Sequence, residues 1–144
     1  VGFTIYIGSK YEAHMTRHFS IIEREAHALG LPVLLWVYPR GKNVKNDVSR
    51  EMMSYASRFA LEVGADIVKL KWNGNFNDLK WVVKSAGRTK VVVAGGIKKD
   101  EKEFLMQVRD IVKAGAAGLA VGRNVWQAEK PLEITGKIKK IVFG

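Results

Sequence analysis

The sequence predicts a parallel α/β fold made of repeated strand–helix units. Short apolar runs rich in β-branched residues alternate with longer amphipathic segments along the chain. The short runs are almost continuously apolar, as strands of a parallel sheet are when both faces are covered. Such regular alternation is typical of a barrel or of an open doubly wound sheet. Composition does not decide between these two architectures.

The spacing of apolar residues places five strands and five helices along the chain. In the second helix, Met52, Tyr55, Phe59 and Val63 form an apolar stripe at helical spacing. The expected strands cover residues 3–7, 33–37, 66–71, 91–94 and 119–121, and the expected helices cover residues 11–29, 48–63, 76–86, 101–114 and 132–142.

Glycines mark the ends of four helices, at Gly30, Gly64, Gly87 and Gly115. Glycine adopts the left-handed conformation of a helix C-cap without steric cost, so short helix-to-strand loops favour it. Judged by these glycines, the unit repeats every 23 to 34 residues or so.

The fourth helix has a start signal as well, because Asp100 followed three residues later by Glu103 resembles a capping box. Five strand–helix units are too few to close an eight-stranded barrel. If the fold is a barrel, about three units are missing on the N-terminal side, whereas an open sheet needs no further part. The start at Val1, at the edge of a strand-like run, favours a truncated chain.

Size and composition indicate a single α/β domain over residues 1–144, with no linker and no low-complexity segment. No apolar run approaches the roughly 18 residues of a membrane span. The absence of cysteine excludes disulfides and thiolate chemistry, which fits a cytoplasmic enzyme. The net charge of +10 fits nucleic acid, a membrane surface or phosphorylated metabolites as partners, although lysines on solvated helix faces account for most of it.

Two lysines stand on one face of the third expected strand. Because a strand alternates its faces, Ile67, Lys69 and Lys71 share one side. Desolvation and mutual repulsion favour the neutral form of such an amine, which is nucleophilic and forms an imine with a carbonyl substrate. From the residues alone, the alternative remains open that both ammonium groups reach solvent beyond the end of the strand.

A second candidate position lies at the end of the second expected strand. Trp36 and Tyr38 share a face there, and Tyr38 stands at the carboxyl end of the strand, where parallel α/β folds bind ligands. A tyrosine at this place can transfer a proton, or it can plug the mouth of a barrel. Pro39 halts the strand, and a polar loop runs from there to Asp47.

Glycine loops follow the last two strands, at Gly95 and Gly96 and at Gly122 with Arg123. Glycines let backbone N–H groups approach an anion closely, and barrels often hold a phosphate in the loops after their last two strands, helped by a short extra helix. Residues 124–127 are expected to form that helix, and the guanidinium of Arg123 adds a charged fork.

Other kinds of site lack their motifs. There is no Walker-type Gly-Lys-Ser/Thr and no Gly-x-Gly-x-x-Gly after a strand, so a nucleotide-binding fold is disfavoured. His14, His18 and His27 all fall in the first helix. His14 and His18 are spaced to share a metal, but no third ligand is placed beside them, so no metal site is expected.

Taken together, five segments resemble the archaeal-type class I fructose-1,6-bisphosphate aldolases, a family that also contains the aldolase-like 2-amino-3,7-dideoxy-heptulosonate synthases. The resemblance covers essentially the whole chain, in order. The matching runs are Val-Gly-Phe-Thr-Ile-Tyr at 1–6, Trp-Val-Tyr-Pro-Arg-Gly-Lys at 36–42, Gly-Ala-Asp-Ile-Val-Lys-Leu-Lys at 64–71, Val-Val-Val-Ala-Gly-Gly at 91–96 and Ala-Gly-Ala-Ala-Gly-Leu-Ala-Val-Gly-Arg-Asn at 114–124.

The resemblance implies a (β/α)8 barrel of which this chain supplies strands four to eight. It implies that Lys69 forms the Schiff base with the substrate and that Tyr38 transfers protons, with Trp36 lining the same pocket. Lys71 would stay charged and favour the neutral form of Lys69. The phosphate grip would come from the glycine loops, at Gly95, Gly96, Gly122 and Arg123.

The implied reaction is cleavage or formation of fructose 1,6-bisphosphate without cofactor or metal, in a cytoplasmic homo-oligomer of glycolysis or gluconeogenesis. The acidic residue that the family places after its first strand lies outside this chain. Two alternatives stay open. The first is the synthase of an aromatic amino-acid precursor, which uses the same imine lysine. The second is a basic nucleic-acid-binding module that would exploit the net charge, although the chain has no recognition motif for nucleic acid. No membrane partner is expected.

Overall fold

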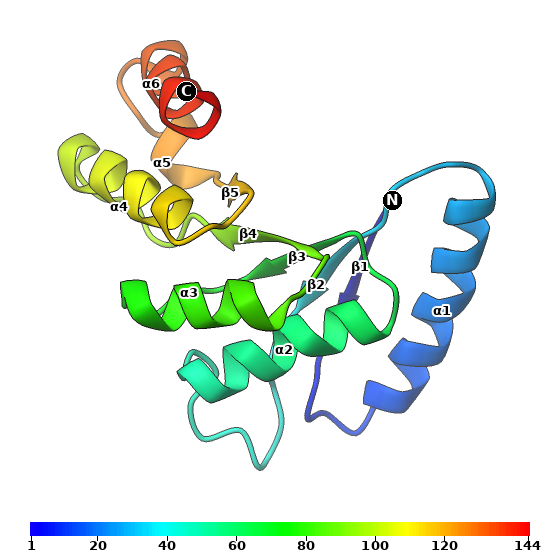
Figure 1. Cartoon of the computed structure of the whole chain (residues 1–144). Helices are drawn as coiled ribbons and strands as arrows, with labels where there is room; N and C mark the ends of the chain where they lie inside the picture. Colours follow the sequence, from blue (N-terminus) through cyan, green and yellow to red (C-terminus); the bar gives the residue numbers. More distant parts are fainter.

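The computed structural model describes all 144 residues as five strand–helix units in series, with one additional short helix (Figure 1). Each predicted strand and helix is confirmed, with bounds that move by at most two residues. The strands are β1 (Gly2–Ile5), β2 (Leu34–Val37), β3 (Ile67–Leu70), β4 (Lys90–Ala94) and β5 (Gly118–Ala120). The helices are α1 (Glu12–Ala28), α2 (Arg50–Glu62), α3 (Phe76–Ser85), α4 (Glu101–Lys113), α5 (Arg123–Trp126) and α6 (Pro131–Phe143).

All five strands join one parallel sheet in the unbroken order β1-β2-β3-β4-β5. An open doubly wound sheet reverses its strand order at a switch point, and this sheet does not. The register aligns Thr4 with Trp36, Trp36 with Lys69, and Lys69 with Val92. Side chains on neighbouring strands that share a face are therefore adjacent across the sheet.

The helices pack along one side of the curved sheet (Figure 1). Strand residues that face the helices are fully buried, as in Leu35, Val68 and Val93. The residues between them, including Trp36 and Lys69, point to the other side and are only half-buried. The main core thus lies between the sheet and its helices, and the opposite face carries the polar candidates.

The predicted glycine caps are confirmed. Gly30, Gly64, Gly87 and Gly115 have φ angles of 71°, 88°, 58° and 93°, in the left-handed region that favours glycine. Each one turns the chain from a helix toward the next strand.

Only half of the predicted capping box forms at α4. The Asp100 carboxylate accepts hydrogen bonds from the N–H groups of Lys102 and Glu103, at 2.9 Å and 3.3 Å. The Glu103 carboxylate does not return to Asp100 and instead pairs with the ammonium of Lys99. The carboxylate that would complete the capping box is therefore bound by Lys99, in the loop before α4.

The predicted apolar stripe of α2 is wrong at one of its four residues, Tyr55. The buried side of this helix carries Met53, Ala56, Ser57 and Ala60, whereas Tyr55 is 56% exposed. The small side chains of Ala56, Ser57 and Ala60 allow α2 to pack closely against the sheet and α3, because larger residues there would hold the helix away. The residues of the expected stripe other than Tyr55 pack at the margin of the core.

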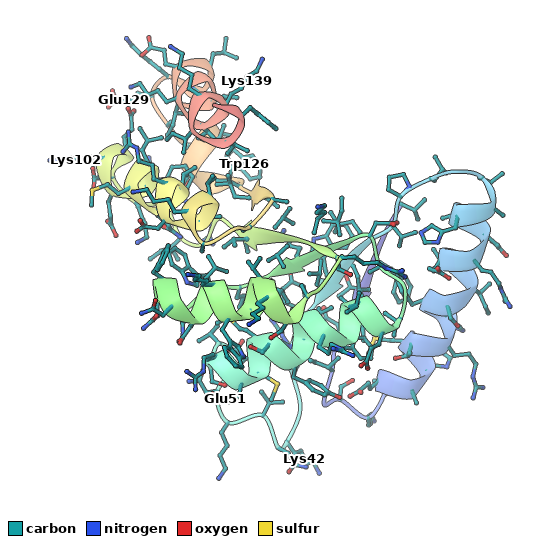
Figure 2. All side chains as sticks on the ribbon, viewed as in Figure 1. Lys42, Glu51, Lys102, Trp126, Glu129 and Lys139 are labelled. Atoms are coloured by element: carbon teal, nitrogen blue, oxygen red, sulfur yellow. The ribbon has the colours of Figure 1, made fainter.

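Charged side chains lie around the periphery of the molecule. Lys42, Glu51, Lys102, Glu129 and Lys139 all point away from the ribbon in Figure 2, and all five are exposed. This arrangement agrees with solvated surfaces as the source of much of the net charge. None of the helices combines the length and the apolar character that a membrane span needs.

An ion cluster joins α1 to the start of β3. The imidazole of His27 lies 2.8 Å from Asp66 through Nε2 and 2.9 Å from Glu23 through Nδ1. The hydrogen bond to Asp66 raises the pKa of His27 above 6.5. The hydrogen bond from the Val33 N–H, together with His27, holds the pKa of Asp66 below 3.8.

This cluster predicts a pH-dependent loss of stability in His27→Ala. Because the folded-state pKa of His27 is raised, its stabilisation is complete below the unfolded pKa and disappears as pH rises through the folded value. We expect the melting temperature of the variant to fall further below wild type at about pH 5.5 than at about pH 9. An equal difference at the two pH values, measured by calorimetry, would contradict the ionic role of His27.

Candidate active site

Lys69 lies at the centre of the candidate site, on the middle strand of the sheet. Its neighbours along β3, Val68 and Leu70, are buried against the helices, so strand alternation turns Lys69 to the opposite face. Its Nζ atom lies 5.9 Å from the centre of the Trp36 ring, which stands beside it in the register of β2 and β3. This separation is a cation–π contact at the outer limit of range.

A cavity of about 430 Å³ opens beside Lys69. It brings together five of the predicted site residues, which come from three successive strand–helix units: Lys69, Gly95, Gly96, Gly122 and Arg123. Lys69 contributes the amine, Arg123 contributes positive charge, and the glycines expose backbone. The cavity therefore combines a primary amine with groups that bind anions.

A second cavity, of about 640 Å³, adjoins the first. Tyr38 and Lys71 line it, and it shares Gly95, Gly96 and Arg123 with the cavity of Lys69. The stacked ring of Tyr6, with its centre 6.1 Å away, supports the ring of Tyr38. The predicted amine and the predicted tyrosine thus face adjoining spaces that have one wall in common.

Trp36 lines neither cavity. Its ring lies across Gly2 on the neighbouring strand, where an added Cβ atom would come within 2.3 Å of it. Because Gly2 has no side chain, the indole can turn toward β1 while still contacting Lys69.

Lys71 is paired with a carboxylate that the sequence analysis did not single out as a site residue. Its Nζ atom lies 2.6 Å from Oδ2 of Asp47, in the loop that joins β2 to α2, and both side chains are a little over a third exposed. The pair ties this polar loop to the end of β3 and places a counter-charge beside Lys71. Its contribution to stability is small, because solvent screens ion pairs this exposed.

The glycine loops present free amide groups. Neither the N–H of Gly96 nor that of Gly122 donates a hydrogen bond within the chain, whereas the N–H of Gly95 bonds to the carbonyl of Ala120. Unpaired backbone N–H groups beside a cation are suited to an anion such as phosphate.

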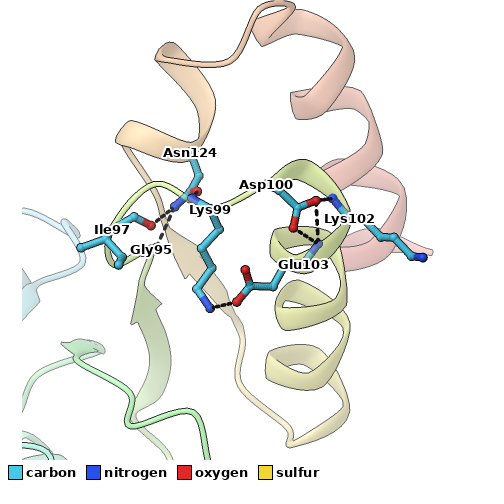
Figure 3. A network of polar contacts seen from close by, with 7 residues as sticks. All are labelled: Gly95, Ile97, Lys99, Asp100, Lys102, Glu103 and Asn124. Carbon is cyan, nitrogen blue, oxygen red and sulfur yellow. Dashed lines mark hydrogen bonds and ion pairs between the residues drawn. The ribbon is translucent and has the colours of Figure 1, made fainter.

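Arg123 and Asn124 link the two glycine loops. The guanidinium of Arg123 donates to the Gly96 carbonyl at 2.8 Å. The side-chain amide of Asn124 donates to the carbonyls of Gly95 and Ile97, both at 2.9 Å, and its oxygen accepts the N–H of Lys99 at 2.7 Å (Figure 3). The loop after β4 is therefore fastened to α5 by the side chains of its first two residues.

Asp47 and Asn124 are the residues that sequence reasoning missed. Asp47 lies 24 residues from Lys71, in a loop without periodicity, so no local signal reveals their pairing. Asn124 directly follows Arg123 of the predicted site, yet nothing in its spacing predicts that its side chain is buried to 3% exposure. A buried asparagine needs partners, and only the fold shows which groups supply them.

The three histidines lie away from the cavities. His14 and His18 lie on α1 with ring centres 4.2 Å apart and ring planes tilted by 56°, and His27 belongs to the ion cluster at Asp66. No group of three or more His, Cys, Asp or Glu residues is arranged to hold a metal ion.

Comparison with known proteins places the chain in a family. The model of the DeoC/LacD family aldolases matches residues 1–128. The chain therefore belongs to the DeoC/LacD family of aldolases.

Three curated relatives show what the chain is similar to. The class 1 fructose-bisphosphate aldolase of Thermoproteus tenax is 44% identical over 145 residues, covering 100% of this chain and 55% of the relative. The enzyme of the same name from Halobacterium salinarum is 44% identical, covering 99% of this chain and 54% of the relative. A 2-amino-3,7-dideoxy-D-threo-hept-6-ulosonate synthase of Archaeoglobus fulgidus is 38% identical, over 100% of this chain and 53% of the relative. The chain spans about half the length of these relatives.

Solved structures agree. An archaeal fructose-1,6-bisphosphate aldolase, with its catalytic Lys covalently bound to the carbinolamine intermediate of the substrate, superposes with a TM-score of 0.94 at 42% identity. The match covers 100% of this chain and 58% of that one.

The packing of the glycine loops predicts the effect of Gly95→Ala. A Cβ atom at Gly95 would lie 2.7 Å from a methyl group of Val121 and 3.0 Å from its Cα, so the loops after β4 and β5 would have to separate. We expect the free energy of unfolding to fall by about 1–3 kcal/mol, as for other overpacked sites. Urea denaturation would measure this change.

Gly136→Ala is the matched control. Gly136 lies inside α6, with no atom within 4 Å of an added Cβ. Alanine is the better helix former, so this variant should gain about 0.5–1 kcal/mol. A Gly95→Ala protein as stable as wild type would show that the two loops are not in close contact.

Proposed function

We propose that the chain forms part of a class I aldolase that cleaves or forms fructose 1,6-bisphosphate through a Schiff base on Lys69. The cavity that joins the Lys69 amine to the glycine loops and Arg123 is the observation on which this proposal depends. It pairs a nucleophile for a ketone with a binding site for the phosphate of the same substrate. Relatives that carry this activity by name support it.

We also propose that the chain supplies strands four to eight of a (β/α)8 barrel. Five parallel strands in unbroken order, with helices along one side, have the arrangement of consecutive barrel units. The chain spans about half of its curated relatives. Further strands would pair with the free edges of β1 and β5, which an isolated sheet would leave open to association.

The proposed reaction begins with attack of the neutral Lys69 amine on the substrate ketone. The C–N bond forms, and after proton transfer the carbinolamine loses water to give a protonated imine. The iminium accepts the electron pair of the bond between the α and β carbons as that bond breaks, which leaves an enamine and releases the aldehyde. Protonation of the enamine carbon and hydrolysis return the ketone and free Lys69. No metal or cofactor enters any step.

Tyr38 is the proposed proton carrier. It lines the cavity adjoining that of Lys69, so its hydroxyl is available to the hydroxyl group whose proton is lost when the carbon–carbon bond breaks. Lys71 lines the same cavity as Tyr38 and remains a charged neighbour of the amine, with Asp47 holding its position. Trp36 covers the Lys69 side chain from β2.

The glycine loops form the proposed phosphate grip. The free N–H groups of Gly96 and Gly122 and the guanidinium of Arg123 would bind the phosphate oxygens, with Gly95 allowing the close approach of the two loops. Holding the phosphate fixes the distance from the ketone carbon to Lys69, which is worth more to the rate than affinity alone.

Borohydride trapping tests the role of Lys69. Incubation with dihydroxyacetone phosphate and borohydride should convert the imine to a stable secondary amine, which peptide mass spectrometry would find on Lys69. Lys69→Met should abolish the adduct, whereas the exposed Lys80→Met on α3 should trap as wild type does. A folded protein with the adduct on Lys71 would contradict the assignment.

The same experiment separates the role of the lysine from the completeness of the barrel. It would be run on the folded chain alone and again after addition of the segment of the Thermoproteus tenax relative that the match leaves uncovered. Trapping only in the mixture would support both proposals, and absence of an adduct in both would exclude the aldolase function.

Tyr38→Phe tests proton transfer. Loss of a positioned general acid or base lowers turnover by about 10² to 10⁴-fold. We expect that loss in fructose 1,6-bisphosphate cleavage, followed by a coupled assay, with unchanged affinity for inorganic phosphate. Tyr55→Phe, at an exposed position on α2, serves as the control and should keep full turnover. Unchanged turnover in Tyr38→Phe would remove the residue from the mechanism.

The synthase function is the second candidate, because a relative of that name is 38% identical over the chain. It would use the same imine lysine with a different pair of carbonyl compounds. Product analysis with dihydroxyacetone phosphate and glyceraldehyde 3-phosphate distinguishes the two enzymes. We further propose that the protein is a cytoplasmic homo-oligomer. The third candidate function, a basic nucleic-acid-binding module, predicts binding to DNA or RNA with a steep salt dependence.

A further inference from the structure

We infer, on the basis of the proposed function, that Asn124 is a positioning residue that aims the Gly96 amide at the substrate phosphate. Asn124 itself lines neither cavity, so it does not meet the substrate. Its effect on phosphate recognition would pass through the backbone of the loop after β4.

The bonding of Asn124 is confined to this one loop. Its side-chain nitrogen donates to the carbonyls of Gly95 and Ile97, and its oxygen accepts the N–H of Lys99 (Figure 3). The side-chain amide of Asn124 thus forms all three hydrogen bonds with the backbone of five consecutive residues, 95–99. A polar side chain buried to 3% exposure and devoted to one loop determines the shape of that loop.

Beyond Gly95, packing does little to hold the same loop. Ile97 is 68% exposed, and no atom lies within 4 Å of the place where a Cβ of Gly96 would stand. Gly96 also adopts a φ of 67°, a conformation that its neighbours must maintain. Hydrogen bonds from the first turn of α5 therefore maintain the backbone around Gly96.

Peptide geometry connects Asn124 to the free amide. The carbonyl of Gly95 and the N–H of Gly96 belong to one planar trans peptide, in which the two groups point in opposite directions. The bond from Asn124 to the Gly95 carbonyl therefore sets the direction of the Gly96 N–H, which has no acceptor within the chain. The bond to the Ile97 carbonyl fixes the next peptide but one in the same way.

Arg123 and Asn124 then have different tasks. Arg123 brings charge to the cavity and bonds to the Gly96 carbonyl. Asn124 contributes no charge and no contact with the cavity, only the orientation of a neighbouring amide. Its removal should weaken recognition of phosphate and leave the reactivity of Lys69 toward a ketone intact.

A pair of ketones tests this separation. Dihydroxyacetone phosphate and dihydroxyacetone carry the same carbonyl and differ in the phosphate. The rate of borohydride trapping on Lys69 would be measured for each ketone. The protein would be used alone or with the added segment, whichever of the two traps dihydroxyacetone phosphate in the wild type. In Asn124→Ala, the preference for the phosphorylated ketone should fall about ten-fold, as expected for one misdirected hydrogen bond to an anion.

Thr89→Val is the matched control. Thr89 is also buried, and its hydroxyl donates to the Ala65 carbonyl at 2.9 Å, just before β4 and at the other end of that strand from the site. This variant also loses a buried hydrogen bond, but its preference between the two ketones should equal that of wild type. If Asn124→Ala does not fold, Asn124→Ser, which retains one hydroxyl donor, should show a smaller fall in the preference.

The outcomes are distinct. If the Asn124 variants slow trapping of both ketones equally, Asn124 is a structural residue only and the inference is wrong. If the wild type traps neither ketone, the proposed Schiff-base function itself fails. A selective loss for the phosphorylated ketone, absent in Thr89→Val, would establish the positioning role.

Discussion

The two-residue period of the parallel strands is the constraint on which the rest of the structure depends. On β3, Val68 and Leu70 are buried beneath the helices, and Lys69 stands between them. A slip of one residue would bury the ammonium in an apolar core and expose two aliphatic side chains, at a large cost in free energy. The hydrophobic effect on one face of the sheet thereby fixes the amine on the other.

A second level of organisation comes from the loops, which are held largely by side-chain hydrogen bonds rather than by an apolar core. Gly95 lets the loops after β4 and β5 meet, and Asn124 and Arg123 then bind them together across 27 to 29 residues of sequence. The result is a rigid backbone frame with free amides beside a cation. Such a frame can recognise an anion without a loss of conformational entropy on binding.

Local signals explain why the strands, helices and glycine caps could be predicted from the sequence. Periodicity and left-handed glycines depend on residues close together in the chain, and Gly30 or Gly115 needs no tertiary partner to reveal its role. The rotation of α2 could not be predicted in this way. It depends on packing against the sheet and α3, which buries Ala56 and Ala60 and leaves Tyr55 exposed. The bonds of Asp47 and Asn124 also depend on distant partners, so they leave no pattern in the sequence.

The position of β3 has one more consequence. It is the third of five strands, with two strands on either side, so both neighbours of Lys69 in the sheet are already in place. Any protein segment added at the outer edges of β1 or β5 leaves these neighbours unchanged. The positions of Trp36 and Val92 beside Lys69 are therefore set by β2 and β4, within the chain itself.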